Sequence, residues 1–152
     1  MAIRFGDIIE IPIRQGLAYA QYTHRVKPYG ALIRVFETTR RQRPRDWAAM
    51  AVSPIAFSVF FPLNSAVRQK VVQVVGRTEV AAWNRALPVF RDGNPHPVTR
   101  KVDTWWLWDG EREWEVGTLT PEQRRMPILG VWDVVMLVAR IEEGWRPELD
   151  PR

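Results

Sequence analysis

Short apolar runs separated by turn sequences fill the first part of the chain. The turn sequences Arg14-Gln15-Gly16 and Lys27-Pro28-Tyr29-Gly30 predict an antiparallel meander with strands at 8–13, 17–26 and 31–37. Pro12 cannot donate a hydrogen bond to a neighbouring strand, which favours a sheet edge for the first strand. Further runs rich in β-branched and aromatic residues predict strands at 55–61, 71–75 and 88–91.

Residues 47–67 form an uncharged run of 21 residues, which is the length of a membrane-spanning helix. Two prolines, Pro54 and Pro62, would interrupt such a helix. The run also contains the polar residues Ser53, Ser58, Asn64 and Ser65. We therefore predict buried strand with turns in this segment, and no membrane span.

The densest aromatic segment is 104–116, which holds four of the eight tryptophans around the pair Asp109-Gly110. Asp-Gly between strand-forming residues is typical of a two-residue hairpin turn with positive φ at both central positions. Such a turn pairs Trp108 with Glu111, Leu107 with Arg112, Trp106 with Glu113, Trp105 with Trp114, and Thr104 with Glu115.

This register sorts the hairpin side chains onto two faces. One face is mainly apolar and is expected to be core; it holds Trp105, Leu107, Trp114 and Val116, with Arg112 near the turn. The other face holds Trp106, Trp108, Glu111, Glu113 and Glu115. That second face is either covered by another part of the chain or is a protein-binding surface.

Helical patterns occur near the C-terminus. The sequence Thr120-Pro121-Glu122-Gln123 is typical of a capping box and predicts a short helix. Apolar residues at helical spacing over 131–143, followed by Gly144, predict an amphipathic helix, although a buried strand over 131–138 also fits the valine-rich sequence. The tail at 146–152 is expected to fray.

These elements predict a single α+β domain over residues 1–152, with a predominantly antiparallel, twisted sheet of about seven or eight strands and C-terminal helices. The 152 residues are 46% hydrophobic and 26% charged, as in an ordinary globular domain. The chain has no cysteine, which excludes disulfides and thiol catalysis and fits a cytoplasmic location. Charged residues near the N-terminus leave no apolar signal-peptide core.

The net charge is +5, and one basic cluster stands out at Arg40, Arg41, Arg43 and Arg45. A solvated loop that aids solubility is the ordinary interpretation of such a cluster. Arginines in a loop can also neutralise phosphates, although no aromatic residues are interleaved here to stack on bases. Nucleic-acid binding through this loop is therefore an alternative function.

No catalytic motif is visible. The two histidines, His24 and His96, are not at a helical metal-ligand spacing, so we expect neither a metal site nor a cofactor. The chain contains no Gly-x-Ser-x-Gly elbow and no phosphate-binding glycine loop. A hydrolase remains a further alternative, and it would need a pocket with polar groups near one of the histidines.

Several segments carry a family resemblance: Gly6-Asp7-Ile8-Ile9-Glu10-Ile11-Pro12, Gly16-Leu17-Ala18-Tyr19-Ala20, Phe60-Phe61, the strand 71–76 and Leu87-Pro88-Val89-Phe90. Together they resemble the immunity protein 26 family. The resemblance implies a cytoplasmic bacterial protein of mostly β, α+β fold that binds and neutralises a toxin of a polymorphic toxin system. It implies no enzymatic activity.

The leading hypothesis is therefore a binding protein of the immunity type that covers the active site of a toxin. Trp106 and Trp108 would anchor the contact, and Glu111 and Glu113 would complement a basic cleft. In the alternative interface the charges are reversed, and an acidic toxin surface contacts Arg40, Arg41, Arg43 and Arg45. The sequence does not favour either interface.

Overall fold

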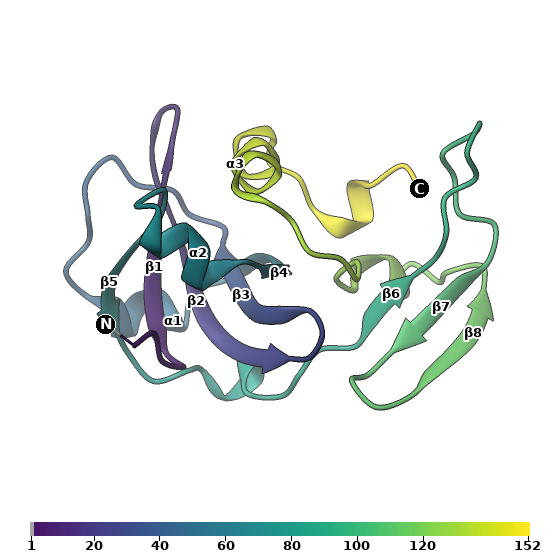
Figure 1. The fold of residues 1–152 in the computed structure, drawn as a ribbon, viewed down its shortest axis with the longest axis horizontal. Helices are drawn as coiled ribbons and strands as arrows, with labels where there is room; N and C mark the ends of the chain where they lie inside the picture. The colour runs from purple at the N-terminus through teal and green to yellow at the C-terminus, as the bar shows by residue number, and fades with distance from the viewer. Residues whose placement is uncertain (1) are drawn as a thin grey trace.

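The computed structural model describes residues 2–152 and has an α+β fold with eight strands in two antiparallel sheets (Figure 1). The five-stranded sheet has the order β4-β3-β2-β1-β5 and comprises β1 (Asp7–Ile13), β2 (Gly16–Val26), β3 (Gly30–Phe36), β4 (Ile55–Phe61) and β5 (Gln73–Arg77). The three-stranded sheet has the order β6-β7-β8 and comprises β6 (Phe90–Asp92), β7 (Trp105–Trp108) and β8 (Glu113–Gly117). The predicted α+β fold class is confirmed.

The N-terminal meander is also confirmed, because β1 pairs antiparallel with β2 and β2 with β3. Strand β5 begins at Gln73, two residues later than predicted. Pro12 does not mark a sheet edge, since β5 pairs with β1 on its other side. However, β5 pairs only with residues 7–10, so Pro12 lies beyond the end of β5, where no backbone donor is needed.

Two short helices flank β4, namely α1 (Trp47–Ala51) and α2 (Leu63–Arg68). The prediction of strand and turns over 47–67 is therefore correct only for β4. Asp46 begins α1 by accepting a hydrogen bond from the Ala49 amide at 3.0 Å. Helices of one or two turns are too short to show an apolar periodicity, which explains why the sequence pattern missed them.

The predicted C-terminal helix is confirmed as α3 (Val134–Glu143), although it begins three residues later than predicted. Asp133 caps it by accepting a hydrogen bond from the Met136 amide at 2.8 Å, and Gly144 ends it with φ of 69°. The strand alternative is wrong, although Val131, ahead of the helix, forms a parallel bridge with Phe60. No helix within residues 2–152 has the length and apolar character needed to span a membrane.

The capping box forms as predicted, because the Gln123 amide donates to Thr120 Oγ1 at 3.1 Å and the Thr120 amide donates to Gln123 Oε1 at 2.9 Å. It leads only into a 3₁₀ turn. The prediction of a frayed tail is wrong. Asp150 is buried and accepts hydrogen bonds from Trp145 Nε1 at 3.3 Å and Arg152 Nε at 2.9 Å, which hold the chain end in place.

The core has apolar layers on both faces of the five-stranded sheet. Leu137 of α3 and Leu63 of α2 pack in the cluster on one face, and Met50 of α1 packs in the cluster on the other. A third cluster contains Phe60 of β4 and Phe90 of β6, whose ring centroids are 5.2 Å apart. This aromatic contact holds the three-stranded sheet beside the five-stranded one (Figure 1).

Candidate functional site on the tryptophan hairpin

The hairpin β7–β8 forms where the sequence places it, but its register differs by two residues. Trp108 pairs with Glu113, Leu107 with Trp114 and Trp106 with Glu115. The connection therefore has four residues, 109–112, and only Gly110 has a positive φ, of 100°. The prediction of a two-residue turn is wrong.

The side chain of Asp109 explains the wider turn. Its Oδ1 accepts hydrogen bonds from the amides of Glu111 at 3.0 Å and Arg112 at 2.9 Å. Together with the bond from the Asp109 amide to the Arg112 carbonyl oxygen at 3.1 Å, they stabilise the four-residue loop. The bond from the Arg112 backbone, followed by that from Glu111, lowers the pKa of the Asp109 carboxyl. Glu111 accordingly lies in the loop and not in β8.

The predicted division of the side chains between the two faces of the hairpin stays the same, because a register shift of two residues leaves each side chain on the same side of its strand. Trp105 and Leu107 are buried as predicted, and the Trp105 ring lies 4.7 Å from the guanidinium carbon of buried Arg91. The prediction that Trp114 is core is wrong, because it is 39% exposed. Trp114 lies on β8, the edge strand, beyond the apolar cluster that covers Trp105 and Leu107.

The second face divides into a covered half and an open half. Trp108 is partly buried, with its ring centroid 5.3 Å from that of Tyr29 and 5.4 Å from that of Phe90. Trp106, two residues earlier on β7, is 38% exposed. The aromatic cluster beside the five-stranded sheet therefore covers the Trp108 end of this face, and the Trp106 end is exposed to solvent.

Carboxylates surround Trp106. Its cross-strand neighbours are Asp92 on β6 and Glu115 on β8. Trp106 also lines a pocket of about 400 Å³ together with Asp92, Asp103 and Glu113. We call this group the acidic tryptophan pocket; its further lining residues are Gly93, Asn94 and Thr104.

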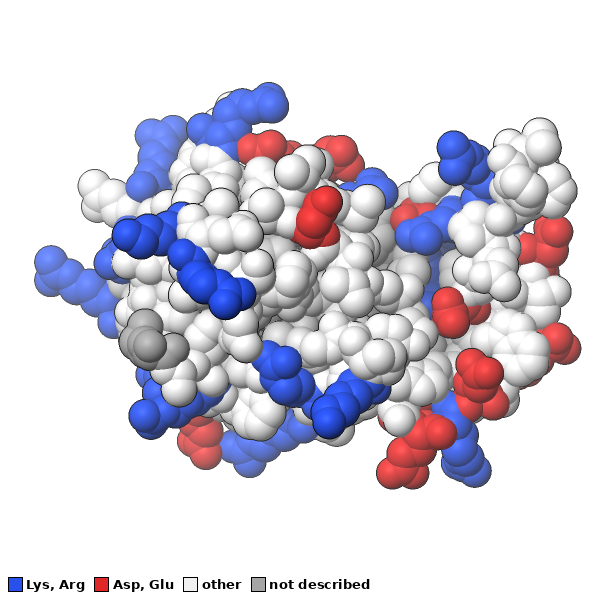
Figure 2. Space-filling view, in the orientation of Figure 1, with Lys and Arg blue, Asp and Glu red and all other residues white. Residues whose placement is uncertain are grey.

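The charge of this region is opposite to that of the whole chain. Figure 2 shows acidic side chains gathered over the part of the molecule that holds β7 and β8, although the net charge is +5. No group of His, Asp and Glu side chains within residues 2–152 is arranged to hold a metal ion. An exposed indole beside carboxylates suits a guanidinium or ammonium group, which can lie over the ring and pair with the acids.

The arginine cluster predicted from the sequence separates into two roles. Arg43 donates to buried Glu10 through Nε at 2.8 Å and Nη2 at 3.0 Å, and Glu10 also accepts from the Tyr19 hydroxyl at 2.7 Å. The hydrogen bond from Arg43 lowers the pKa of Glu10, and burial raises the pKa of Tyr19. Arg43, although its side chain is 48% exposed, is thus tied to the five-stranded sheet through Glu10. Arg40, Arg41 and Arg45 are also exposed, and they form no ion pair within the described residues.

Both histidines have local structural roles. His24 Nε2 donates to the Arg85 carbonyl oxygen at 2.8 Å, so its Nδ1 accepts from the Thr23 hydroxyl, also at 2.8 Å. Burial lowers the pKa of His24. His96 Nδ1 accepts hydrogen bonds from the amides of Val98 at 3.1 Å and Thr99 at 3.2 Å. These contacts give the hydrolase alternative no support.

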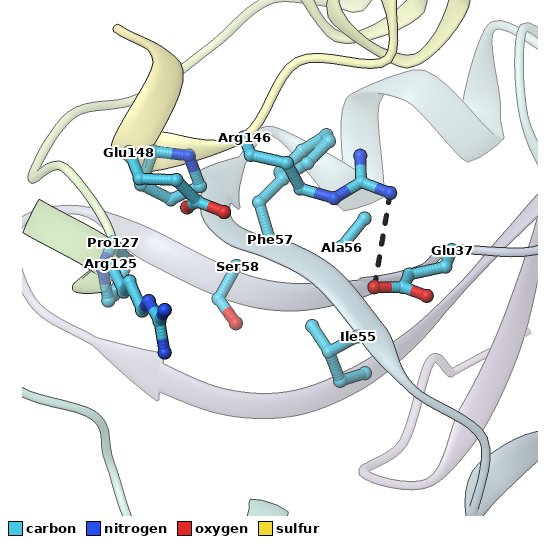
Figure 3. Close-up of a pocket in the computed structure, with 10 residues that line it drawn as sticks. Glu37, Ile55, Ala56, Phe57, Ser58, Arg125, Pro127, Arg146 and Glu148 are labelled. Atoms are coloured by element: carbon cyan, nitrogen blue, oxygen red, sulfur yellow. Dashed lines mark ion pairs between the residues drawn. The ribbon is translucent and has the colours of Figure 1, made fainter. Parts of the chain in front are cut away.

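A separate pocket of about 270 Å³ lies beside β4 (Figure 3). Glu37 and Arg146 form an ion pair across it at 4.0 Å, and Arg125 and Glu148 add one charge of each sign. The Ser58 hydroxyl accepts a hydrogen bond from buried Arg34 at 3.4 Å. With balanced charges and no histidine in its lining, this pocket offers no activated nucleophile.

The sequence pattern predicted Trp106 and Glu113 as site residues but contained no signal that Asp92 and Asp103 line the same pocket. Asp92 belongs to the sequence Asp92-Gly93-Asn94-Pro95, whose only visible signal is a turn. The pairing of β6 with β7 then places Asp92 opposite Trp106.

Comparisons of the chain with protein-family models, with curated proteins and with solved structures found no match.

Proposed function

We propose that this chain is a protein-binding module of the immunity type, which neutralises a cognate toxin by covering its active site. The observation that carries the proposal is Trp106, a large aromatic side chain left 38% exposed between Asp92 and Glu115. Tryptophan is enriched at the energetic centres of protein interfaces, where neighbouring polar groups exclude water.

The acids around Trp106 define the chemistry of the partner. Asp92, Asp103 and Glu113 line one pocket, so an arginine or lysine of the partner could pair with a carboxylate and lie against the indole. Toxins that act on nucleic acids carry basic clefts for phosphates. A basic cleft occupied by this acidic face would be closed to its substrate.

The covered half of the hairpin face supports this role. Trp108 packs against Tyr29 and Phe90, which fixes β7 to the body of the protein. Trp106 is therefore presented by a strand whose position is set before binding. A preorganised anchor loses little conformational entropy when a complex forms.

The test is inhibition and binding of a toxin encoded beside the gene for this chain. The wild-type chain should inhibit the toxin, and Asp92→Asn combined with Glu113→Gln should weaken binding by about 2 kcal/mol, or roughly 30-fold. The matched control is Glu79→Gln combined with Glu122→Gln, which removes the same charge from two exposed positions outside the pocket. Equal weakening by both pairs would contradict the proposal.

A further inference from the structure

A second pocket, on a different part of the molecule, has the opposite charge. It has a volume of about 820 Å³ and lies between the β1–β2 turn, residues 39–41 and the last turns of α3. Its charged lining consists of Arg14, Arg40, Arg41 and Glu142. We propose that this basic pocket binds a ligand that carries two or more phosphate groups.

The side chains of the three arginines are available to bind such a ligand. None of the three forms an ion pair within the part of the chain that the structure describes. Glu142 accepts a hydrogen bond from the backbone amide of Arg14, so its carboxylate holds the β1–β2 turn against α3. Figure 2 shows basic side chains around this turn, at the top of the view.

The backbone that carries Arg40 and Arg41 is fixed at two points. The first is an exchange of hydrogen bonds between Leu17 and Arg40, at 2.7 and 2.8 Å. Gly16 permits this approach, because a Cβ at that position would lie 2.4 Å from the Arg40 carbonyl oxygen. The second is the double hydrogen bond from Arg43 to Glu10. Between these points the chain presents Arg40 and Arg41 in a set position.

This arrangement suits phosphate better than other anions. Guanidinium groups bind phosphate oxygens through two parallel hydrogen bonds, and several such groups around one pocket can hold adjacent phosphates. No aromatic side chain lines the pocket, so bases would find no stacking platform. The ligand would therefore be held by its phosphates, whether these belong to a small polyphosphate or to a nucleic-acid backbone.

The experiment measures the binding of tripolyphosphate and of a short single-stranded RNA by calorimetry, from about 50 to about 200 mM salt. Arg40→Ala combined with Arg41→Ala should weaken both by about tenfold or more. For the RNA, the slope of log affinity against log salt should fall by about 0.7 for each lost contact. The control is Lys101→Ala combined with Arg112→Ala, which removes the same charge from exposed positions outside the pocket and should change affinity less than about twofold.

Circular dichroism should show that both double variants remain folded, because all four side chains are exposed. Tighter binding of the RNA would identify a nucleic-acid backbone as the ligand, and tighter binding of tripolyphosphate would identify a small polyphosphate. The proposal is overturned if the wild type binds neither probe, if the Arg40/Arg41 variant binds as tightly as the wild type, or if a polyglutamate peptide binds as well as the phosphates.

Discussion

Replacement of Trp108 by alanine tests the contact that joins the two sheets. The Trp108 ring centroid lies 5.3 Å from Tyr29, 5.4 Å from Phe90 and 6.4 Å from Phe60. A tryptophan in a core buries about 150–250 Å², which corresponds to roughly 4–6 kcal/mol at about 25 cal/mol per Å². Because Trp108 is only partly buried, we expect the free energy of unfolding to fall by about 3 kcal/mol.

Urea denaturation followed by far-UV circular dichroism measures this change. Trp114→Ala is the matched control, because Trp114 lies on the edge strand of the same hairpin and is 39% exposed. We expect this control to lose about 1 kcal/mol. If Trp108→Ala costs no more than Trp114→Ala, the aromatic cluster does not hold the sheets together, and the reasoning that Trp106 is presented by a fixed strand fails.

Two further predictions concern the segment that carries the arginines. Hydrogen bonds lower the pKa of Glu10 below its ordinary value of 4.5, so its contribution to stability is present above that value and is lost as pH falls through the folded-state pKa. Glu10→Gln should therefore lose stability less steeply with acid than the wild type in thermal melts; parallel curves would contradict the prediction. Gly16→Ala should free the Arg40 backbone from Leu17, because its Cβ would lie 2.4 Å from the Arg40 carbonyl oxygen. Hydrogen exchange at the Leu17 and Arg40 amides should become faster, and unchanged protection would show that the contact tolerates a methyl group.

The sequence predicted features that depend on local chemistry and on strand alternation. The meander follows from two turn sequences, and the faces of the hairpin follow from a side-chain period of two. The predicted register of the hairpin was wrong because the Asp109 carboxylate accepts hydrogen bonds from the amides of Glu111 and Arg112 and so stabilises a longer loop. The pair Asp-Gly alone does not determine whether these hydrogen bonds form. The burial of Trp114 was wrong because alternation identifies a face but not whether another element covers it.

The residues of the acidic tryptophan pocket could also be predicted only in part from the sequence. Trp106 and Glu113 come from one hairpin and could be placed together from the sequence. Asp92 and Asp103 join them only because β6 pairs with β7 and the chain between the two strands folds back. The path of the irregular connection 93–104 between these two strands leaves no periodic signal, so the two acids could not be assigned to the site in advance.

The proposed function requires that Trp106, and not the hairpin in general, contacts a basic protein partner. The most direct test is the affinity of Trp106→Ala and Trp114→Ala for the inhibited toxin, measured by calorimetry. The two side chains are exposed to nearly the same extent, 38% and 39%, on opposite faces of the hairpin. We expect Trp106→Ala to lose about 2 kcal/mol of binding free energy and Trp114→Ala to bind as the wild type does. Equal affinity of the two variants would contradict the proposed role of Trp106.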